Sequence, residues 1–381
     1  MYTKIKNVLH ASLIGIPVAF GSVQAKAQQV ITIGLAGPLT GISAAHGKDI
    51  ENGVRMAIDD ANAQGVKLGG REVRFALESV DDQGDPRVGV QVAQKLVDDG
   101  VAIVLGHYNS GVTLPASKIY AAGGIPLIDP FSTNPAITRQ GLDSVFRIIP
   151  TDAQNSGNAG TYAVTVTKAK RIAVMDDRTA FGQGEAEEFK KAVTAAGGTI
   201  VASEFTSDKA VEFNAQLTNI KGANADVLFF GGVDSQAALV DKRMKQLGMR
   251  TQFLGGGAIV STIFTQIGGN AAEGALAWEY GRPIDHLPGG REFAQKYKKK
   301  FGTDMLTYSP FAYDATWIAI TAMKQANSEK PAAVVPKLRS MRYTGITGNI
   351  SFDQYGDLKN PSSTLYEVKH GKWVPVTTTG M

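Results

Sequence analysis

The chain has 381 residues, 43% of them hydrophobic, a formal net charge of +4 and no cysteine. This length exceeds one ordinary hydrophobic core and predicts roughly two domains. Lys4, Lys6 and Lys26 lie in an N-terminal leader, so the rest of the chain carries only +1, which argues against a nucleic-acid binder. The missing cysteines exclude a disulfide, a thiolate nucleophile and a lipid anchor on an N-terminal cysteine.

The leader has the pattern of a cleavable export signal. Two lysines precede the mostly apolar residues 8–23, and Ala25-Lys26-Ala27 offers a small-x-small cleavage site. We expect residues 1–27 to be removed and the mature protein to begin at Gln28. The apolar run is shorter than the ~20 residues that span a bilayer, so we expect a freely diffusing periplasmic protein.

Strand and helix patterns alternate along the rest of the chain. Strands are predicted at 30–36, 71–80, 101–105, 125–128, 145–149, 171–175, 199–205, 226–230 and 252–254. Helices are predicted at 47–61, 86–98, 111–120, 152–166, 184–196, 211–220, 235–247, 290–301, 310–326 and 332–341, before a β-rich tail at 348–376. The pattern restarts after Pro150-Thr151-Asp152, and a second crossover is expected at 279–283. Two similar units in tandem predict an α/β protein of two lobes.

Hydroxyl side chains follow two consecutive strands of the first unit. Ser110 comes after the strand at 101–105, and Ser132 and Thr133 come after the strand at 125–128. Loops that leave parallel strands emerge at the same edge of the sheet, so these side chains are expected to face one crevice. Such a crevice suits a small anion.

Catalytic signatures are mostly missing. The glycines after the first strand do not have dinucleotide-binding spacing, the run from Gly41 to Lys48 is not a phosphate loop, and no serine has glycine two places on either side. The histidines are too dispersed for a metal-binding helix; they include His46, His107, His286 and His370. An enzyme or metalloprotein is therefore disfavoured, and no cofactor is expected.

Several short motifs, taken together in their order and spacing, resemble the branched-chain amino-acid binding proteins of ABC importers. The resemblance covers nearly all of the mature chain. Its motifs are Gly34-x-x-Gly37-Pro38-Leu39-Thr40-Gly41, 47–62, Asp81-Asp82, Gly106-His107, Pro115-Ala116-Ser117, Thr133-Asn134-Pro135, Phe181-Gly182-Gln183-Gly184 and Ala272-Glu273-Gly274.

The resemblance implies a type I periplasmic binding protein fold, with two doubly wound Rossmann-like lobes, three hinge crossings and a central cleft. The expected lobes are 28–149 with about 284–347, and 150–283 with about 348–381. It also implies a monomer that holds a small ligand, a neutral aliphatic amino acid or a similar carboxylate, and delivers it to an inner-membrane permease. No chemistry is implied.

The resemblance assigns the ligand carboxylate to Ser110 and further hydroxyl and backbone contacts to Phe131 and Thr133. Uncharged hydroxyl and amide donors near a helix start can hold a carboxylate without a basic side chain. The structural alternatives are a helix cap for Ser110 and a turn or cap for Thr133 before Asn134-Pro135.

Two aromatic positions of the family align with His46 and Phe181, which are expected to wall the ligand side chain. A solvated His46 and a Phe181 packed beneath its own loop are the alternatives.

The sequence departs from the family at two places. Gly84 and Asn109 stand where relatives carry a disulfide, and Gly257 stands where the family has an acid for the ligand ammonium. Asp234 is the nearest replacement by strand order, and its alternative role is the cap of the helix from Ser235. A ligand without an ammonium group therefore stays open, as do a periplasmic sensor of the same fold and an α/β enzyme.

Overall fold

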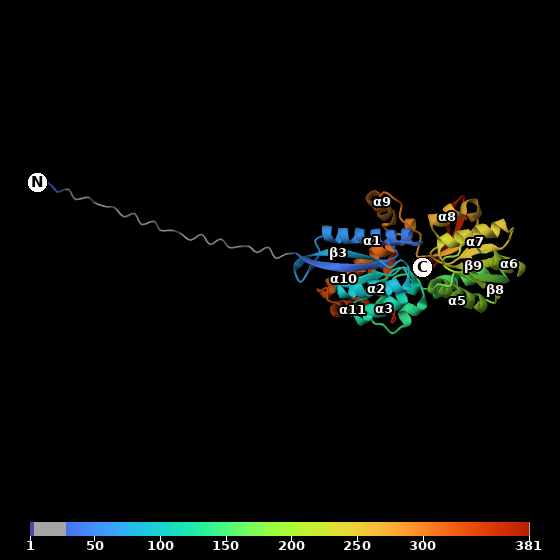
Figure 1. Ribbon diagram of the computed structural model, residues 1–381, viewed down its shortest axis with the longest axis horizontal. Coiled ribbons are helices and arrows are strands. Elements are labelled where there is room, and N and C mark those ends of the chain that lie inside the picture. Colours follow the sequence, from blue (N-terminus) through green and yellow to red (C-terminus); the bar gives the residue numbers. More distant parts are fainter. Residues whose placement is uncertain (4–27, 381) are drawn as a thin grey trace.

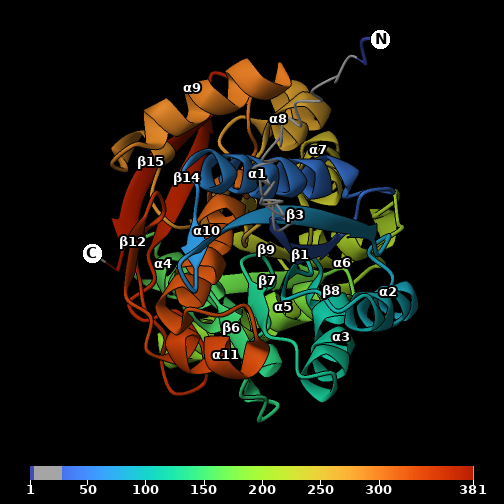
Figure 2. The same cartoon turned by 90° about the vertical axis from the view of Figure 1, so that its left-hand side faces the viewer.

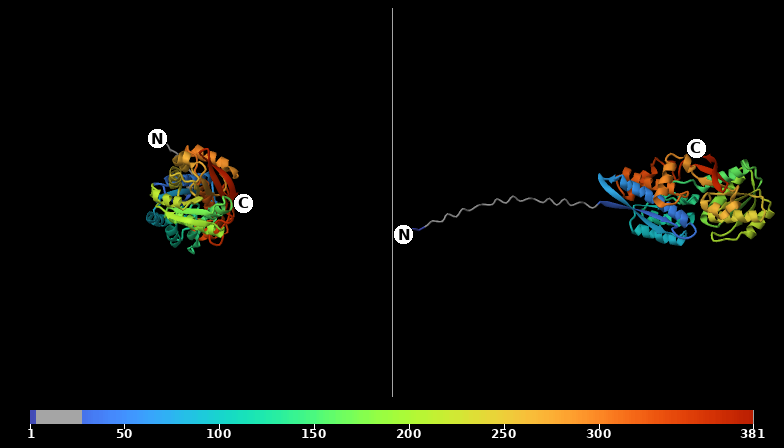
Figure 3. Two further views of the ribbon diagram at one scale, coloured as in Figure 1. Left: turned by 90° about the vertical axis from the view of Figure 1, so that its right-hand side faces the viewer. Right: turned by 90° about the horizontal axis from the view of Figure 1, so that it is seen from above.

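The computed structural model describes residues 1–3 and 28–380. Two α/β bodies lie side by side along the long axis of the molecule (Figure 1), and each is built on its own sheet. The view from above separates the same two bodies (Figure 3). The predicted two-lobed α/β class is confirmed, whereas the leader at 4–27 lies outside the described residues.

The first lobe contains a six-stranded sheet in the order β2-β3-β1-β4-β5-β6, parallel except for the pair β2 and β3. Its strands are β1 (Gln29–Gly37), β2 (Lys67–Leu68), β3 (Arg71–Asp81), β4 (Ile103–Gly106), β5 (Leu127–Asp129) and β6 (Val145–Arg147). Its helices are α1 (Ala44–Ala63), α2 (Pro86–Asp98), α3 (Ser110–Ala122), the 3-10 helix η1 (Pro135–Arg139), and the later α9 (Gly290–Phe301), α10 (Ser309–Ala326) and α11 (Pro331–Arg339). The hairpin β12 (Tyr343–Gly345) and β13 (Gly348–Ile350) completes it.

Alternating residues of the first sheet pack into layers on its two faces, as the period of a strand requires. Ile33, Leu35 and Ile103 are buried with residues of α1 and α10 on one face. Ala36 and Val104 are buried with residues of α2 and α3 on the other. Figure 2 shows this arrangement, with α1 and α3 on opposite sides of β3 and β1.

The second lobe contains a seven-stranded sheet in the order β15-β14-β11-β10-β9-β7-β8. Its strands are β7 (Arg171–Asp176), β8 (Thr199–Phe205), β9 (Val227–Gly231), β10 (Gln252–Gly255), β11 (Leu276–Tyr280), β14 (Ser363–Lys369) and β15 (Lys372–Thr379). Its helices are α4 (Asp152–Thr165), α5 (Ala180–Ala195), α6 (Asn214–Gly222), α7 (Asp234–Gln246) and α8 (Thr262–Gly268), with η2 (Gly269–Ala272) as a 3-10 turn, whereas the 3-10 turn η3 (Ile284–His286) follows this lobe and contacts α9. The antiparallel strands β14 and β15 confirm a β-rich tail.

Local capping signals explain which helix boundaries the sequence predicts well. The side chain of Asp85 accepts hydrogen bonds from the N–H groups of Arg87 at 2.7 Å and Val88 at 3.3 Å, and Pro86 opens α2 at the predicted residue. Helix α8 was not predicted because its seven residues carry too little periodicity. Its cap is Ser261, whose hydroxyl accepts the N–H of Phe264 at 3.2 Å.

The chain passes between the lobes three times. The first two crossings lie between β6 and α4 and between β11 and η3. The third lies after Asp357 rather than near residue 348, because β13 pairs within the first lobe and Phe352 joins its core.

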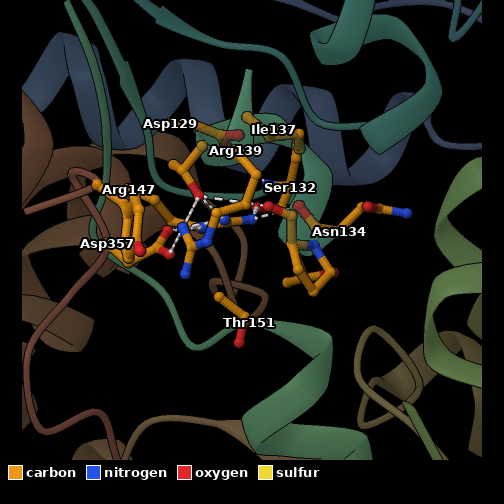
Figure 4. A network of polar contacts seen from close by, with 12 residues as sticks. Asp129, Ser132, Asn134, Ile137, Arg139, Arg147, Thr151 and Asp357 are labelled. Atoms are coloured by element: carbon orange, nitrogen blue, oxygen red, sulfur yellow. Dashed lines mark hydrogen bonds and ion pairs between the residues drawn. The ribbon is translucent and has the colours of Figure 1, made fainter. Parts of the chain in front are cut away.

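A buried ion pair fixes the chain just before this third crossing (Figure 4). The guanidinium of Arg147, fully buried at the end of β6, donates to Oδ1 of Asp357 at 2.9 and 2.7 Å. The same guanidinium donates to the carbonyl oxygens of Ser132 at 3.2 Å and Asn134 at 2.9 Å. Arg147 therefore connects the third crossing to the loop that contains Thr133.

Candidate functional site

The two hydroxyl-bearing loops of the first lobe meet as predicted, at the edge where β4 and β5 end. Ser110 is fully buried and is the first residue of α3. Its Oγ accepts hydrogen bonds from the N–H groups of Thr133 and Asn134, each at 3.3 Å. Since Asn109 holds the cap position, Ser110 is not the helix cap. Its hydroxyl proton remains available to a ligand oxygen.

Thr133 lies between two parts of the site. One is formed by the N–H groups of the 133–134 loop beside Ser110, and the other, the acidic side, is formed by the buried carboxyl groups of Asp152 and Glu185. Its carbonyl oxygen accepts the N–H of Asp152 at 3.0 Å across the first crossing. Its Oγ1 is buried and has no hydrogen-bond partner among the described residues. The side chains of Asp152 and Tyr280 lie near this hydroxyl. Thr133 can therefore both donate to an anion and accept from a cation.

Ser132 and Phe131 have different surroundings. The hydroxyl of Ser132 donates to the carbonyl oxygen of His107 at 2.7 Å and contacts Oγ1 of Thr113. Ser132 thus turns into the first lobe instead of facing the crevice with Thr133, contrary to the expectation. Phe131 is buried edge-on against Tyr308, with ring centroids 5.9 Å apart.

His46 is buried at the interface between the lobes, which excludes the solvated alternative. Its ring stacks on Tyr108 at a centroid distance of 5.5 Å and meets Tyr308 edge-on at 5.6 Å. Its Nε2 lies 3.0 Å from Oδ2 of Asp234 in the second lobe. Burial acts to lower the pKa of His46, but the hydrogen bond and charge of Asp234, with smaller effects of other acids, leave that pKa above its usual value.

Asp234 has a different role from the cap considered in the sequence. It is the first residue of α7, and Val233 occupies the cap position. Its Oδ2 accepts the hydroxyl of Ser261 as well as contacting His46, while Oδ1 accepts the N–H of Ser235 at 2.8 Å. Asp234 therefore faces the other lobe, and both of its oxygens have partners.

Apolar side chains from both lobes close around the centre of the site. Phe181 is the second residue of α5 and not part of a loop, and it packs against the core of the first lobe. A cavity of about 10 Å³ is lined by Tyr108, Asn109, Phe131, Phe181, Val233, Ala258 and Tyr308. A larger groove of about 720 Å³ between the lobes includes Asn109, Phe181 and Val233 in its wall.

Sequence reasoning missed the acidic side of the site, which is formed by Asp152, at the start of α4, and Glu185 on α5. Both are fully buried. Neither oxygen of Asp152 and only one oxygen of Glu185 has a hydrogen-bond partner in the described part of the chain. Phe181 and Glu185 are four residues apart on one helix and so share a face. This four-residue spacing from the predicted site residue Phe181 was the sequence signal that could have identified Glu185.

Glu185 and Tyr280 fill the space beside the glycines of the loop after β10. Oε1 of Glu185 accepts the N–H of Gly257 at 2.7 Å. A Cβ at Gly256 would lie 2.1 Å from that oxygen, and a Cβ at Gly257 would lie 1.9 Å from the hydroxyl of Tyr280. This loop has no room for an acidic side chain. A carboxylate reaches the same region from α5 instead.

Burial makes both carboxyl groups weak acids. It raises the pKa of Asp152 to about 7, against the opposing effects of Thr133 and Arg147. It raises the pKa of Glu185 well above the usual value, and the charge of Asp152 adds to that shift. A cation would stabilise their ionised forms.

The described residues include no cluster of three or more His, Cys, Asp or Glu side chains that suits a metal ion. None of the helices in this part of the chain is long and apolar enough to cross a membrane. The arrangement provides donors for an anion, acceptors for a cation and an apolar wall, which together suit binding of a small zwitterion.

The chain is similar over nearly its whole length to several known binding proteins. The chain is 33% identical over 367 residues, 96% of its length and 97% of the relative's, to the Leu/Ile/Val-binding protein homolog 1 of Brucella suis. A leucine-binding protein, LivK, from Thermotoga maritima superposes with a TM-score of 0.84 and 25% identity, covering 91% of this chain and 98% of that one. An R. palustris solute-binding protein in complex with benzoate shares the fold, with a TM-score of 0.83, 22% identity and coverage of 92% and 96%.

The family model described as periplasmic binding protein matches residues 30–372. This family is a non-enzymatic transport component, in agreement with the missing catalytic motifs. The chain belongs to the periplasmic binding protein family.

Proposed function

We propose that this protein captures a neutral α-amino acid with an aliphatic side chain between its lobes and delivers it to an ABC permease. The observation that carries the proposal is the position of Thr133 between donors for a carboxylate and acceptors for an ammonium group. Its N–H lies beside the Ser110 hydroxyl, and its own hydroxyl lies beside Asp152. The two charged ends of an amino acid are separated in the same way.

The rest of the site supports the same ligand class. Ser110 and the N–H groups of the 133–134 loop supply uncharged donors for the carboxylate. Glu185 supplies a carboxylate for the ammonium group, in place of the acid that Gly257 cannot carry. Phe131, Phe181 and Tyr308 supply an apolar wall for a branched side chain. The names of the Brucella and Thermotoga relatives point to leucine, isoleucine and valine as the first ligands to test.

A ligand without an amino group is the second candidate, because the benzoate-bound R. palustris protein has the same fold. The buried acids Asp152 and Glu185 disfavour it here, since a ligand without an ammonium group would leave their free oxygens without a donor, and its carboxylate would face a like charge wherever either acid is ionised. A periplasmic sensor of this fold would use the same ligand site. Such a sensor would differ only in the partner protein that recognises its closed, ligand-bound form.

Titration calorimetry of leucine and its des-amino analogue 4-methylpentanoate tests the ligand class. We expect stoichiometric binding of leucine and weaker binding of the analogue and of benzoate. Glu185→Gln should weaken leucine binding more than binding of the analogue, because only leucine carries the ammonium charge. The matched control is Asp241→Asn, because Asp241 is also a buried acid but lies on a different helix, α7. Tighter binding of the analogue or benzoate than of any amino acid would refute the proposal.

Ligand binding is proposed to close the lobes about the three crossings, because the contacts made by one ligand with both lobes favour the closed form. Small-angle scattering should record a smaller radius of gyration at saturating leucine, and an unchanged radius would count against closure.

Export to the periplasm is proposed from the leader. Mass spectrometry of the exported protein should give a monomer that begins near Gln28, and retention of residues 1–27 would contradict this.

A further inference from the structure

Two buried carboxyl groups with unpartnered oxygens lie together at the acidic side of the site. They belong to Asp152 and Glu185, and both side chains are fully buried. A Cβ placed at Gly184, the neighbour of Glu185, would lie 2.6 Å from Oδ2 of Asp152. Asp152 therefore lies against the first turns of α5, where α4 and α5 pack together, and its charge acts on the Glu185 carboxyl group.

Such a pair does not carry two negative charges at neutral pH. Two adjacent carboxylates repel each other, and each also loses hydration on burial. Both oxygens of Asp152 and Oε2 of Glu185 lack a hydrogen-bond donor among the described residues, so no hydrogen bond to these three oxygens offsets a second charge. One shared proton leaves the pair with a single negative charge.

We infer that ligand binding expels this proton to solvent and that the ligand ammonium group takes its place. Before binding, the pair carries one proton and a charge of about −1. After binding, the two carboxylates and the ligand ammonium group again give about −1 at the acid pair, while the ligand carboxylate is held separately by the donors of Ser110 and the 133–134 loop. The charge at the pair itself is therefore unchanged, and the proton leaves to solvent. Thr133 Oγ1 and the Tyr280 hydroxyl, both buried and without partners in the described structure, supply further acceptors for the ammonium hydrogens. The inference rests on the proposed amino-acid ligand.

Other charged groups face the pair from neighbouring elements and bear on its titration. Arg147 at the end of β6 favours ionised Asp152, whereas Glu188 on α5 opposes it. Asp177 after β7 and Glu279 in β11 oppose ionisation of Glu185. Both are themselves buried acids, and burial raises the pKa of Asp177 to about 6 and that of Glu279 to about 7.

A separate titrating group, the imidazole of His46, lies where α1 meets α7. His46 contacts Asp234 across the interface, and lobe closure can therefore take up a proton on His46 while the acid pair releases one. The total proton exchange measured for the wild-type protein combines these effects. The test has to compare variants that differ only at the acid pair.

The experiment is calorimetric titration of the full mature protein with leucine at pH 7 in buffers of different ionisation enthalpy. The slope of the observed enthalpy against that of the buffer gives the number of protons exchanged. We expect the wild-type protein to release about one proton more per leucine than Glu185→Gln or Asp152→Asn. Asp241→Asn should match the wild-type protein, because it removes a buried acid whose charged neighbour is Lys245 and not the site.

Two outcomes would overturn the inference, and they are distinguishable. Leucine binding with equal proton exchange in the wild-type protein and in both acid-pair variants would overturn it while leaving the proposed function intact. A failure of every amino acid to bind the wild-type protein would overturn the proposed function and this inference with it. Circular dichroism should establish that each variant is folded before titration, and the use of two isosteric variants keeps the comparison decisive if one does not fold.

Discussion

His46 and Asp234 face each other across the two lobes, with Nε2 of the imidazole 3.0 Å from Oδ2 of the carboxylate. Both side chains are buried and each belongs to a different lobe, so the contact forms only when the lobes are close. Ser261 holds the same carboxylate oxygen from within the second lobe. The pair is thus built to stabilise the closed arrangement, and opening the lobes would return both groups to water.

Asp234→Asn should therefore weaken ligand binding by destabilising closure and not by removing a ligand contact. We expect a loss of roughly 2–5 kcal/mol, the range for breaking one side of a buried hydrogen-bonded charge pair. Because both oxygens of Asp234 already have partners, leucine and 4-methylpentanoate should lose equally. Calorimetry of both ligands checks this, and a loss confined to leucine would place Asp234 at the ammonium group instead.

The carboxylate contacts give a second prediction. Ser110→Ala should weaken both leucine and 4-methylpentanoate by roughly 1.5–3 kcal/mol, the range for hydrogen bonds to charged groups. Thr133→Val should weaken leucine more than 4-methylpentanoate, because the Thr133 hydroxyl lies beside Asp152 and also faces the ammonium group. Ser132→Ala is the matched control, since its hydroxyl donates to the His107 carbonyl inside the first lobe. It should lower the melting temperature with less effect on affinity. Unchanged affinity in Ser110→Ala would remove this serine from the site.

Much of the fold follows from local sequence signals, whereas the site depends on contacts between distant segments. The alternation of strands and helices, and the start of α2 at Pro86 after its Asp85 cap, are visible in short windows. The meeting of Ser110 with the 133–134 loop follows from parallel-strand geometry alone. These features could be predicted because each depends on neighbouring residues or on one sheet edge.

The acidic side of the site could not be predicted from local sequence patterns or from the edge of one sheet. Asp152 and Glu185 come together only through the packing of α4 on α5, and a buried acid looks the same in sequence as an exposed one. Ser132 and Thr133 are adjacent, yet only the tertiary bonds of Ser132 turn its hydroxyl away. The contact between His46 and Asp234 spans 188 residues and two lobes, and local patterning does not specify it.

The Arg147–Asp357 pair predicts a link between stability and the ligand loop. Asp357→Asn leaves the buried guanidinium without its counter-charge and should cost roughly 3–5 kcal/mol of stability at pH 7. Affinity for leucine should fall as well, because Arg147 also holds the carbonyl oxygens on both sides of Thr133. Asp143→Asn is the control, since its pair with Arg339 lies at the surface and should change little. Equal melting temperatures for both variants would contradict the prediction.

The same pair gives a pH dependence. Burial acts to raise the pKa of Asp357, but the charge and hydrogen bonds of Arg147, with those of Arg139 and Thr138, hold that pKa below its usual value. A lowered pKa in the folded state contributes stability above the unfolded pKa, and this contribution is lost as the pH falls through the folded value. Urea titrations should therefore find wild type and Asp357→Asn converging in stability at strongly acidic pH.

Asp241 provides the last prediction, a stabilising substitution away from the cleft. It is fully buried on α7, neither of its oxygens has a partner among the described residues, and burial raises its pKa to about 7. A raised pKa means that the folded protein binds the proton more tightly than the unfolded chain, so this group reduces stability as the pH rises from about 4 towards 7. Asp241→Asn removes that penalty. We expect it to increase the free energy of unfolding by roughly 1–4 kcal/mol at pH 8 and by much less at pH 4. Urea denaturation at both pH values checks this, and an equal change at the two would mean that the carboxyl group does not titrate in this range.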